Sequence, residues 1–262
     1  MKKQIFIKTF LIAFVLAIAG CSGDDTNENT NVNTETPILI KTITEKVHYG
    51  SDHEQTTVYN FNYENNKLQS LVIGDYETKY IYNGDKIVKA VYFENGIQNG
   101  STTIVYDGDF VKYTLSDDEY HEKTEYTYLN GHVASVKSGY MSNGEYVLLA
   151  KEDYTFSNGN LIEELFYSNT FGSPYFSKSI YTYDTKNNPG KFMNPYLRLF
   201  FQSESFSAFS ENNILSRTYG PPDSATLSRQ ECEIVYNDRD FPVKIVKKQD
   251  GSVIADATIE YQ

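Results

Sequence analysis

The chain has 262 residues, with 23 Lys and Arg against 35 Asp and Glu, and a formal net charge of −12 at pH 7. So acidic a chain repels polyanions, which argues against nucleic acid as a partner. Tyr and Phe are abundant, at 23 and 16, and Trp is absent. This composition favours β-structure, because aromatic side chains suit the pleated surface of a strand.

Residues 1–20 have the layout of a secretory signal peptide. Three lysines among the first eight residues form a positive end, and an apolar run follows from Phe10 to Ala19. A membrane-spanning helix needs about 20 apolar residues, roughly twice this run. We therefore expect the segment to be removed rather than retained.

The sequence Ile18-Ala19-Gly20-Cys21, directly after the apolar run, resembles a bacterial lipobox. The resemblance implies cleavage before Cys21 and attachment of several lipid chains to it, which anchor a protein durably where one chain is marginal. An ordinary secreted protein with a cysteine at this place is the alternative. The following Ser-Gly-Asp-Asp resembles the export signal of Bacteroidota lipoproteins, so we expect a lipid-anchored protein of the outer membrane, exposed at the cell surface.

The mature chain divides into a tether and one domain. Residues 22–36 contain a single apolar side chain, Val32, and cannot bury enough surface to fold. We expect a disordered, lipid-anchored tether over residues 21–36 and a single β domain over residues 37–262, which is long enough for a sizeable core. Cys232 then has no partner for an intramolecular disulfide, and we expect it to be a small buried hydrophobe in a strand.

A recurring unit fills the chain from Tyr59 onward, as in YIYNGDKIVKAV from Tyr80 and IVYDGDFVKYTL from Ile104. Each unit has two aromatic or apolar residues at i and i+2, then a short Asn/Asp/Gly cluster, then a second alternating run. The alternation puts the paired residues on one face of a strand, and Asn-Gly or Asp-Gly supplies the positive φ angles of a tight turn. Each unit therefore predicts a β-hairpin. The second aromatic positions are Tyr63, Tyr82, Tyr106, Tyr128, Phe156, Tyr183 and Tyr236.

A period of roughly twenty to thirty residues indicates an array of such hairpins. It predicts an all-β, antiparallel up-and-down meander of about 14–16 strands, which must curl because open sheets rarely exceed about ten strands. A barrel and a half-barrel remain open, although closure removes exposed edges. The rhythm breaks over residues 190–230, where Pro195 suits the first turn of a helix. We expect a short helical insertion near residues 195–208 that plugs the concave side of the sheet.

These units resemble the tyrosine-rich YD-type repeats of bacterial surface and toxin-shell proteins. They are more closely similar to Bacteroidota surface lipoproteins of unknown function with a porin-like antiparallel barrel. The likeness spans residues 38–262, including YDTKNNPGKFMNPY from Tyr183. It implies a fold and a location and brings no catalytic residues. Membrane barrels present a continuous apolar band to lipid, whereas these strands carry Lys, Glu, Thr and Ser at alternate positions, so we expect a barrel held by its lipid rather than a porin.

Candidate sites are few. In the insertion, Tyr196, Phe200 and Phe201 form either a structural plug or the wall of a ligand cavity. Ser224, between Asp223 and Ala225, matches a three-residue pattern that resembles the O-glycosylation signal of Bacteroidota.

Catalytic, metal and cofactor signatures are missing from the sequence. The histidines are scattered without an HExxH spacing, the acidic clusters match no EF-hand loop, and there is no G-x-S-x-G elbow. The one adjacent carboxylate pair in a hairpin unit, Glu163-Glu164, faces opposite sides of a strand. We expect no catalytic residue, metal or cofactor.

The prediction for function is a non-enzymatic binding or interaction lipoprotein of the cell envelope. Its ligand would be a glycan, a small apolar molecule or another envelope protein. One alternative is a glycan-active hydrolase of the outer membrane, which needs two carboxylates about 5–10 Å apart. The other is a purely structural repeat module with a filled interior.

Overall fold

The computed structural model describes residues 37–262 apart from 50–52, 118–120, 169–174, 204–206 and 225. The predicted signal peptide and tether, with Cys21, lie outside the described residues.

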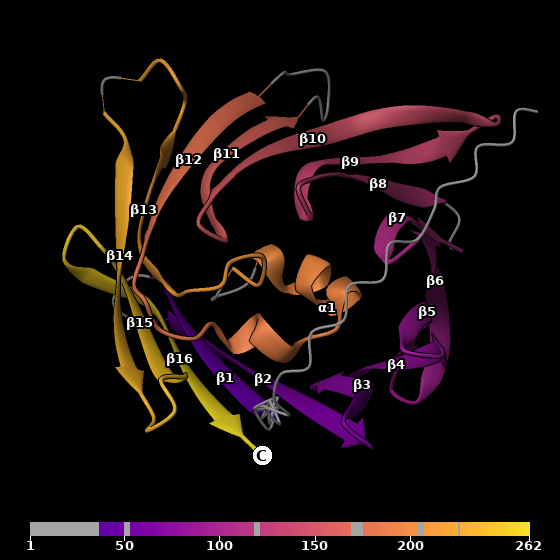
Figure 1. Cartoon of the computed structure of the whole chain (residues 1–262), viewed down its shortest axis with the longest axis horizontal. Helices are drawn as coiled ribbons and strands as arrows, with labels where there is room; N and C mark the ends of the chain where they lie inside the picture. Colours follow the sequence, from indigo (N-terminus) through magenta and orange to yellow (C-terminus); the bar gives the residue numbers. More distant parts are fainter. Residues whose placement is uncertain (1–36, 50–52, 118–120, 169–174, 204–206, 225) are drawn as a thin grey trace, which may run out of the picture. The chain divides into compact units, whose positions relative to one another are not determined.

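The described residues form a closed antiparallel barrel in up-and-down order, in which the first strand pairs with the last (Figure 1). Its strands are β1 (Ile40–Tyr49), β2 (His53–Glu64), β3 (Lys67–Ile73), β4 (Tyr76–Asn83), β5 (Lys86–Glu94), β6 (Ile97–Asp107), β7 (Phe110–Ser116), β8 (Glu122–Leu129), β9 (His132–Ser142), β10 (Glu145–Ser157), β11 (Asn160–Ser168), β12 (Tyr175–Tyr183), β13 (Ile214–Gly220), β14 (Ser228–Tyr236), β15 (Pro242–Gln249) and β16 (Ser252–Tyr261). The all-β meander is confirmed, and of the two alternatives the closed barrel is the one observed.

The hairpin turns have the backbone that their residues predict. Asn130 and Gly131 have φ angles of 52° and 82°, and Asn95, Asn143 and Asn158 likewise have positive φ angles before a glycine. Two consecutive positive φ angles match the twist of the flanking strands, which is why Asn-Gly is favoured in two-residue loops.

A β-bulge follows the turns that come after the second aromatics, and it recurs around the barrel. Tyr82 pairs with Ile87 while Ile81 pairs with Lys89, so Val88 is an extra residue in β5. Because the extra residue shifts the alternation by one, Ile87 and Ala90 are both fully buried although they are three residues apart. The same shift occurs opposite the other second aromatics, Tyr63, Tyr106, Tyr128, Phe156, Tyr183 and Tyr236.

Tyrosine hydroxyl groups join neighbouring hairpins at the end of the barrel where these bulges lie. The β5–β6 ladder ends at the pair Lys89 and Thr103, and the carbonyl of Ile87 lies beyond it. Tyr106 donates its hydroxyl to that carbonyl at 2.9 Å. Equivalent bonds run from Tyr82 to Leu68, from Tyr183 to Leu161 and from Tyr261 to Pro242, at 2.9, 2.6 and 2.8 Å. We call these bonds the tyrosine bridges.

Two further observations fit a structural role for the repeated tyrosines. Burial raises the pKa values of Tyr82 and Tyr106 to about 12, so both hydroxyls remain protonated donors even in mildly alkaline solution. At five of the turns, the residue that follows the turn also covers the ring of the next hairpin. The pairs and their distances to or between ring centroids are Lys67 on Tyr82 at 5.6 Å, Lys86 on Tyr106 at 5.5 Å, Phe110 on Tyr128 at 4.6 Å, His132 on Phe156 at 4.6 Å and Phe241 on Tyr261 at 5.8 Å.

The segment between β12 and β13, residues 184–213, lies inside the ring of strands (Figure 1), and we call its described part the plug. It contains the short helices η2 (Pro189–Phe192), α1 (Pro195–Phe200) and η3 (Phe201–Ser203). Asn194 caps α1 by accepting a bond from the backbone N–H of Tyr196, with Pro195 in the first turn. The predicted helical insertion is therefore confirmed. No helix among the described residues is long and apolar enough to span a membrane.

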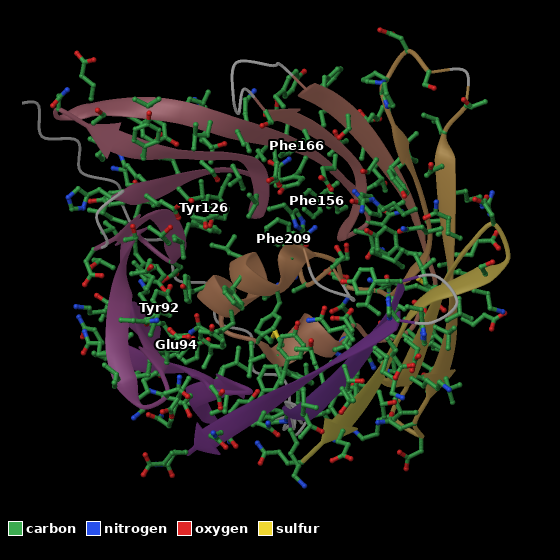
Figure 2. All side chains as sticks on the ribbon, turned by 180° about the vertical axis from the view of Figure 1, so that it is seen from behind. Tyr92, Glu94, Tyr126, Phe156, Phe166 and Phe209 are labelled. Atoms are coloured by element: carbon green, nitrogen blue, oxygen red, sulfur yellow. The ribbon has the colours of Figure 1, made fainter. Side chains whose placement is uncertain are left out.

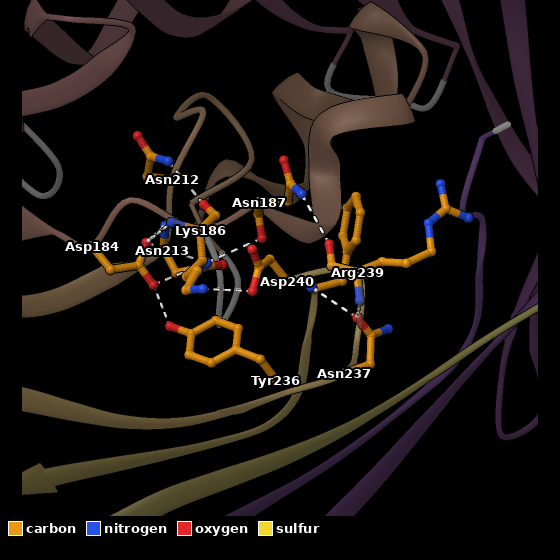
Figure 3. A network of polar contacts seen from close by, with 10 residues as sticks. Asp184, Lys186, Asn187, Asn212, Asn213, Tyr236, Asn237, Arg239 and Asp240 are labelled. Carbon is orange, nitrogen blue, oxygen red and sulfur yellow. Dashed lines mark hydrogen bonds and ion pairs between the residues drawn. The ribbon is translucent and has the colours of Figure 1, made fainter. Parts of the chain in front are cut away.

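A polar network ties both ends of the plug to the β14–β15 loop (Figure 3). Asp184 accepts bonds from the side-chain amide of Asn213, at 3.2 Å, and from the hydroxyl of Tyr236. Lys186 forms an ion pair with Asp240 at 2.6 Å. The motif that starts at Tyr183 thus positions the plug, because its polar side chains find partners where the chain enters and leaves the barrel.

Replacing Tyr106 by Phe removes one tyrosine bridge and leaves a carbonyl without its donor. We expect the free energy of unfolding in urea to fall by about 1–2 kcal/mol.

The reverse change is available at Phe156, the one aromatic of the series without a hydroxyl. The β9–β10 ladder ends at Asp153 and Ser135, so Phe156→Tyr places a donor near the Val133 carbonyl and should add about 0.5–1 kcal/mol.

The control is Tyr49→Phe, since this ring is 59 % exposed and outside the series. Equal effects of Tyr49→Phe and Tyr106→Phe would contradict the structural role of the bridges.

Candidate functional site

A polar cavity of about 270 Å³ lies inside the barrel, between the plug and strands β10–β15. We call it the luminal cavity. The inward-facing residues of these six successive strands form its wall, and Gln202 and Ser207 of the plug form its floor. Phe166 supplies apolar wall (Figure 2). The cavity therefore combines charged, hydroxyl and aromatic groups in one place.

Two carboxylates share the inward face of β10 and β11. In the ladder Glu152 lies opposite Phe166, and Tyr154 lies opposite Glu164, so Glu152 and Glu164 are diagonal neighbours on that face. Glu163 points outward, as its position next to Glu164 predicts, and forms an ion pair with Lys178 at 2.6 Å.

Tyrosine hydroxyls bind both inward carboxylates. Tyr154 donates to Glu152, and Tyr181 donates to Glu164 at 2.5 Å. Burial raises the pKa of Glu152, the bond from Tyr154 opposes this rise, and the charge of Glu164 adds to it. Burial is also the main reason that the pKa values of Tyr154 and Tyr181 lie well above the ordinary value. The site thus holds proton donors beside an acid that retains its proton more tightly than usual.

Two cations face these acids across the cavity. Arg217 donates from Nε and Nη2 to the hydroxyl of Ser179 at 3.2 and 3.0 Å, and its guanidinium lies 5.8 Å from the ring centroid of Tyr181. Lys247 pairs with Cys232 across β14 and β15. Burial raises the pKa of the Cys232 thiol and the nearby Lys247 opposes this, so the thiol is a weak nucleophile. The arrangement suits hydrogen bonding on several sides and ring stacking more than covalent chemistry.

The predicted site residues lie elsewhere. Tyr196 and Phe201 are buried in the core, and Phe200 is exposed. None of the three lines the luminal cavity, so their role as a ligand-cavity wall stays a prediction. Ser224 lies in the loop between β13 and β14, where its hydroxyl bonds to the backbone of Thr226. Its glycosylation and the lipidation of Cys21 are likewise untested.

The sequence analysis missed Glu152 and Arg217. A usable signal was present in KEDYTF: Glu152 precedes Tyr154 by two residues, and Tyr154 in turn precedes the inward aromatic Phe156 by two. Alternation alone therefore places Glu152 inside the barrel. Among the described residues, no group of three or more His, Cys, Asp or Glu side chains is arranged to hold a metal ion.

Two solved structures share this architecture. A porin-like protein from Bacteroides uniformis matches with a TM-score of 0.59 at 12 % sequence identity, over 86 % of this chain and 99 % of its own. A porin-like protein from Bacteroides vulgatus matches with a TM-score of 0.53 at 19 % identity, over the same shares. No protein-family model matches the chain, and no curated protein matches it. At such identities the likeness establishes the fold, which is the porin-like barrel expected from the sequence.

Replacing Glu152 by Gln tests the electrostatics of the cavity. Since the pKa of Glu152 is raised in the folded state, its contribution to stability is full below the unfolded-state pKa, about 4.3, and is lost as the pH rises through the folded-state pKa. Glu152→Gln is neutral at every pH. It should therefore unfold at a higher urea concentration than the wild type at neutral pH, with a difference that vanishes below about pH 4.

Glu163→Gln is the matched control, because it removes an outward carboxylate from the neighbouring strand. We expect it to be neutral or slightly destabilising across the same range. A stability difference for Glu152→Gln that does not change with pH would contradict the burial of its charge.

Proposed function

We propose that the protein is a non-enzymatic binding lipoprotein of the bacterial outer membrane, and that it holds a small polar ligand, a glycan, in the luminal cavity. The observation that carries this proposal is the gathering of Glu152, Glu164 and Arg217 on the inward face of one part of the barrel. Burying charges is unfavourable unless they have partners, and a purely structural barrel gains nothing from a cavity lined with them.

The chemistry of the wall favours a glycan. Sugar hydroxyls donate to carboxylates and accept from guanidinium groups, and the apolar face of a pyranose stacks on aromatic rings such as Tyr181 and Phe166. The volume, about 270 Å³, is slightly below the about 300–1,000 Å³ of drug-sized pockets. A single sugar residue or the end of a chain fits that size.

The outer wall supports a barrel that lies in water. Ion pairs occupy its outward positions, among them Lys151 with Asp153 at 2.6 Å and Lys79 with Glu77 at 3.3 Å. On a lipid-facing wall, Lys and Arg are unfavourable by about 2–4 kcal/mol each at the bilayer midplane, and Asp and Glu are unfavourable to a smaller extent. Attachment would come instead from lipid on Cys21, at the outer membrane and facing the cell exterior. The Bacteroides proteins of the same fold are consistent with an envelope location.

The carboxylates also favour a second candidate, a glycan-active hydrolase. Glu152, whose pKa is raised by burial, has the property of a general acid, and Glu164 on the same face has the position of its partner. Hydrolysis would appear in a binding experiment as recovery of a shortened glycan.

A glycan binding screen on the full chain tests the proposed site. Glu164→Gln and Arg217→Met should each weaken binding of a hit by about tenfold or more, because each removes a charge-assisted hydrogen bond. Glu163→Gln, on the outward face, should leave the dissociation constant unchanged. The proposal fails if no glycan binds, or if all three variants bind alike. Chromatography of the recovered glycan separates binding from hydrolysis.

Cys21→Ser tests the anchor. Without a lipidated cysteine, the protein should move from the membrane fraction to the soluble fraction, because the remaining chain has no other attachment in this proposal. Cys232→Ser is the matched control and should remain in the membrane fraction. Retention of Cys21→Ser in the membrane would contradict the lipid anchor.

A further inference from the structure

A second cavity lies at the hairpin tips, between the turns of β6–β7 and β8–β9 and the plug, with a volume of about 240 Å³. We call it the tip cavity. It shares no lining residue with the luminal cavity. Tyr154 lines the luminal cavity and Phe209 lines the tip cavity, and their rings meet edge to face at 5.5 Å. These two rings divide the two spaces.

The tip cavity lies at an interruption in the series of tyrosine bridges. Phe156 has no hydroxyl to donate to the previous hairpin, and the ring of His132 stacks on it at 4.6 Å. Figure 2 shows Phe156 on the wall close to Phe209 of the plug, and both belong to one apolar cluster with Val133. A third cavity, of about 410 Å³, opens between the β8–β9 and β10–β11 hairpins. It shares His132, Val133 and Phe156 with the tip cavity and Tyr154 with the luminal cavity. The tip cavity therefore reaches the wall at a position that has no tyrosine bridge.

The lining of the tip cavity is mainly apolar. Phe110 and Tyr128 lie with ring centroids 4.6 Å apart, and Phe156 and Leu199 add further apolar surface. The Asp109 side chain is 94 % exposed and forms an ion pair with Lys86 at 3.0 Å, so its charge is compensated at the mouth. An aromatic or aliphatic group fits these walls.

Arg198 is the one permanent cation among the described residues of this lining. It donates from Nε to the carbonyl of Ala208 at 2.6 Å and from Nη2 to the carbonyl of Phe209 at 2.9 Å. These bonds hold the guanidinium in place. A guanidinium has five N–H donors, so bonds to two carbonyls leave further donors for a ligand. Burial lowers the pKa of Arg198 while the charge of Glu211 opposes this, so an anion in the cavity would stabilise the buried charge.

We propose that the tip cavity binds a small amphipathic anion, an aromatic or short aliphatic carboxylate. The carboxylate bonds to Arg198, and the apolar part lies against Phe110, Tyr128 and Phe156. The site is distinct from the luminal cavity, because the two spaces share no lining residue.

The test uses phenylacetate and its neutral analogue phenylacetamide, titrated into the full chain by calorimetry. Phenylacetate should bind about tenfold or more tightly than phenylacetamide, because a bond between two charged groups is stronger than one with a neutral partner. Equal affinities would overturn the assignment of an anion site, and no binding of phenylacetate at millimolar concentration would overturn the site altogether.

Phe110→Ala and Tyr49→Ala locate the binding, because both side chains lie outside the buried core. They are 43 % and 59 % exposed, and only Phe110 lines the tip cavity. Phe110→Ala should weaken phenylacetate binding by about five- to tenfold through lost apolar contact, and Tyr49→Ala by less than about twofold. Weakening by Arg217→Met without weakening by Phe110→Ala would place the ligand in the luminal cavity and refute the proposal. The glycan screen tests the luminal cavity separately, so the proposal for one cavity can be refuted while the proposal for the other stands.

Discussion

A closed ring of sixteen strands encloses more space than its own inward side chains can fill. Barrels of about eight strands are filled by side chains, whereas those of about 16–18 strands leave an aqueous channel unless something occupies them. In this protein the plug occupies the lumen, and it packs unevenly. Its apolar residues join a core with β1–β7 and β15–β16, while its polar Gln202 and Ser207 face β10–β15 across a cavity. The position of the candidate site follows from this uneven packing.

The repeat that dominates the sequence serves the wall rather than the site. Each second aromatic lies opposite a bulge, and several of the tyrosines donate to the hairpin before them, as Tyr106 does to Ile87. Binding chemistry lies where the units depart from this pattern. Glu152 and Arg217 put charge on inward positions, and Phe156 lacks the hydroxyl that its position has elsewhere. Because most units keep the pattern of the wall, the residues that depart from it indicate candidate binding sites.

Hairpins, strand order and the helix that starts at Pro195 were predictable, because alternation and turn chemistry act over a few residues. Closure of the barrel was not predictable, since it depends on pairing Ile43 with Ile259 at opposite ends of the domain. The site residues were missed for a related reason: six strands contribute to one wall, and no short motif unites them. Tyr196 and Phe201 lie in the insertion that interrupts the repeat, and both rings are buried in the core, where apolar side chains are most often found.

The most direct test of this account asks whether the plug fills the lumen against the early strands. The rings of Phe61 on β2 and Phe201 on the plug have centroids 5.6 Å apart. In a nuclear Overhauser spectrum of the protein with labelled phenylalanine, a cross-peak should connect these two rings. Its absence, with narrow signals from a freely moving Phe201, would mean that the lumen is open and would contradict the account.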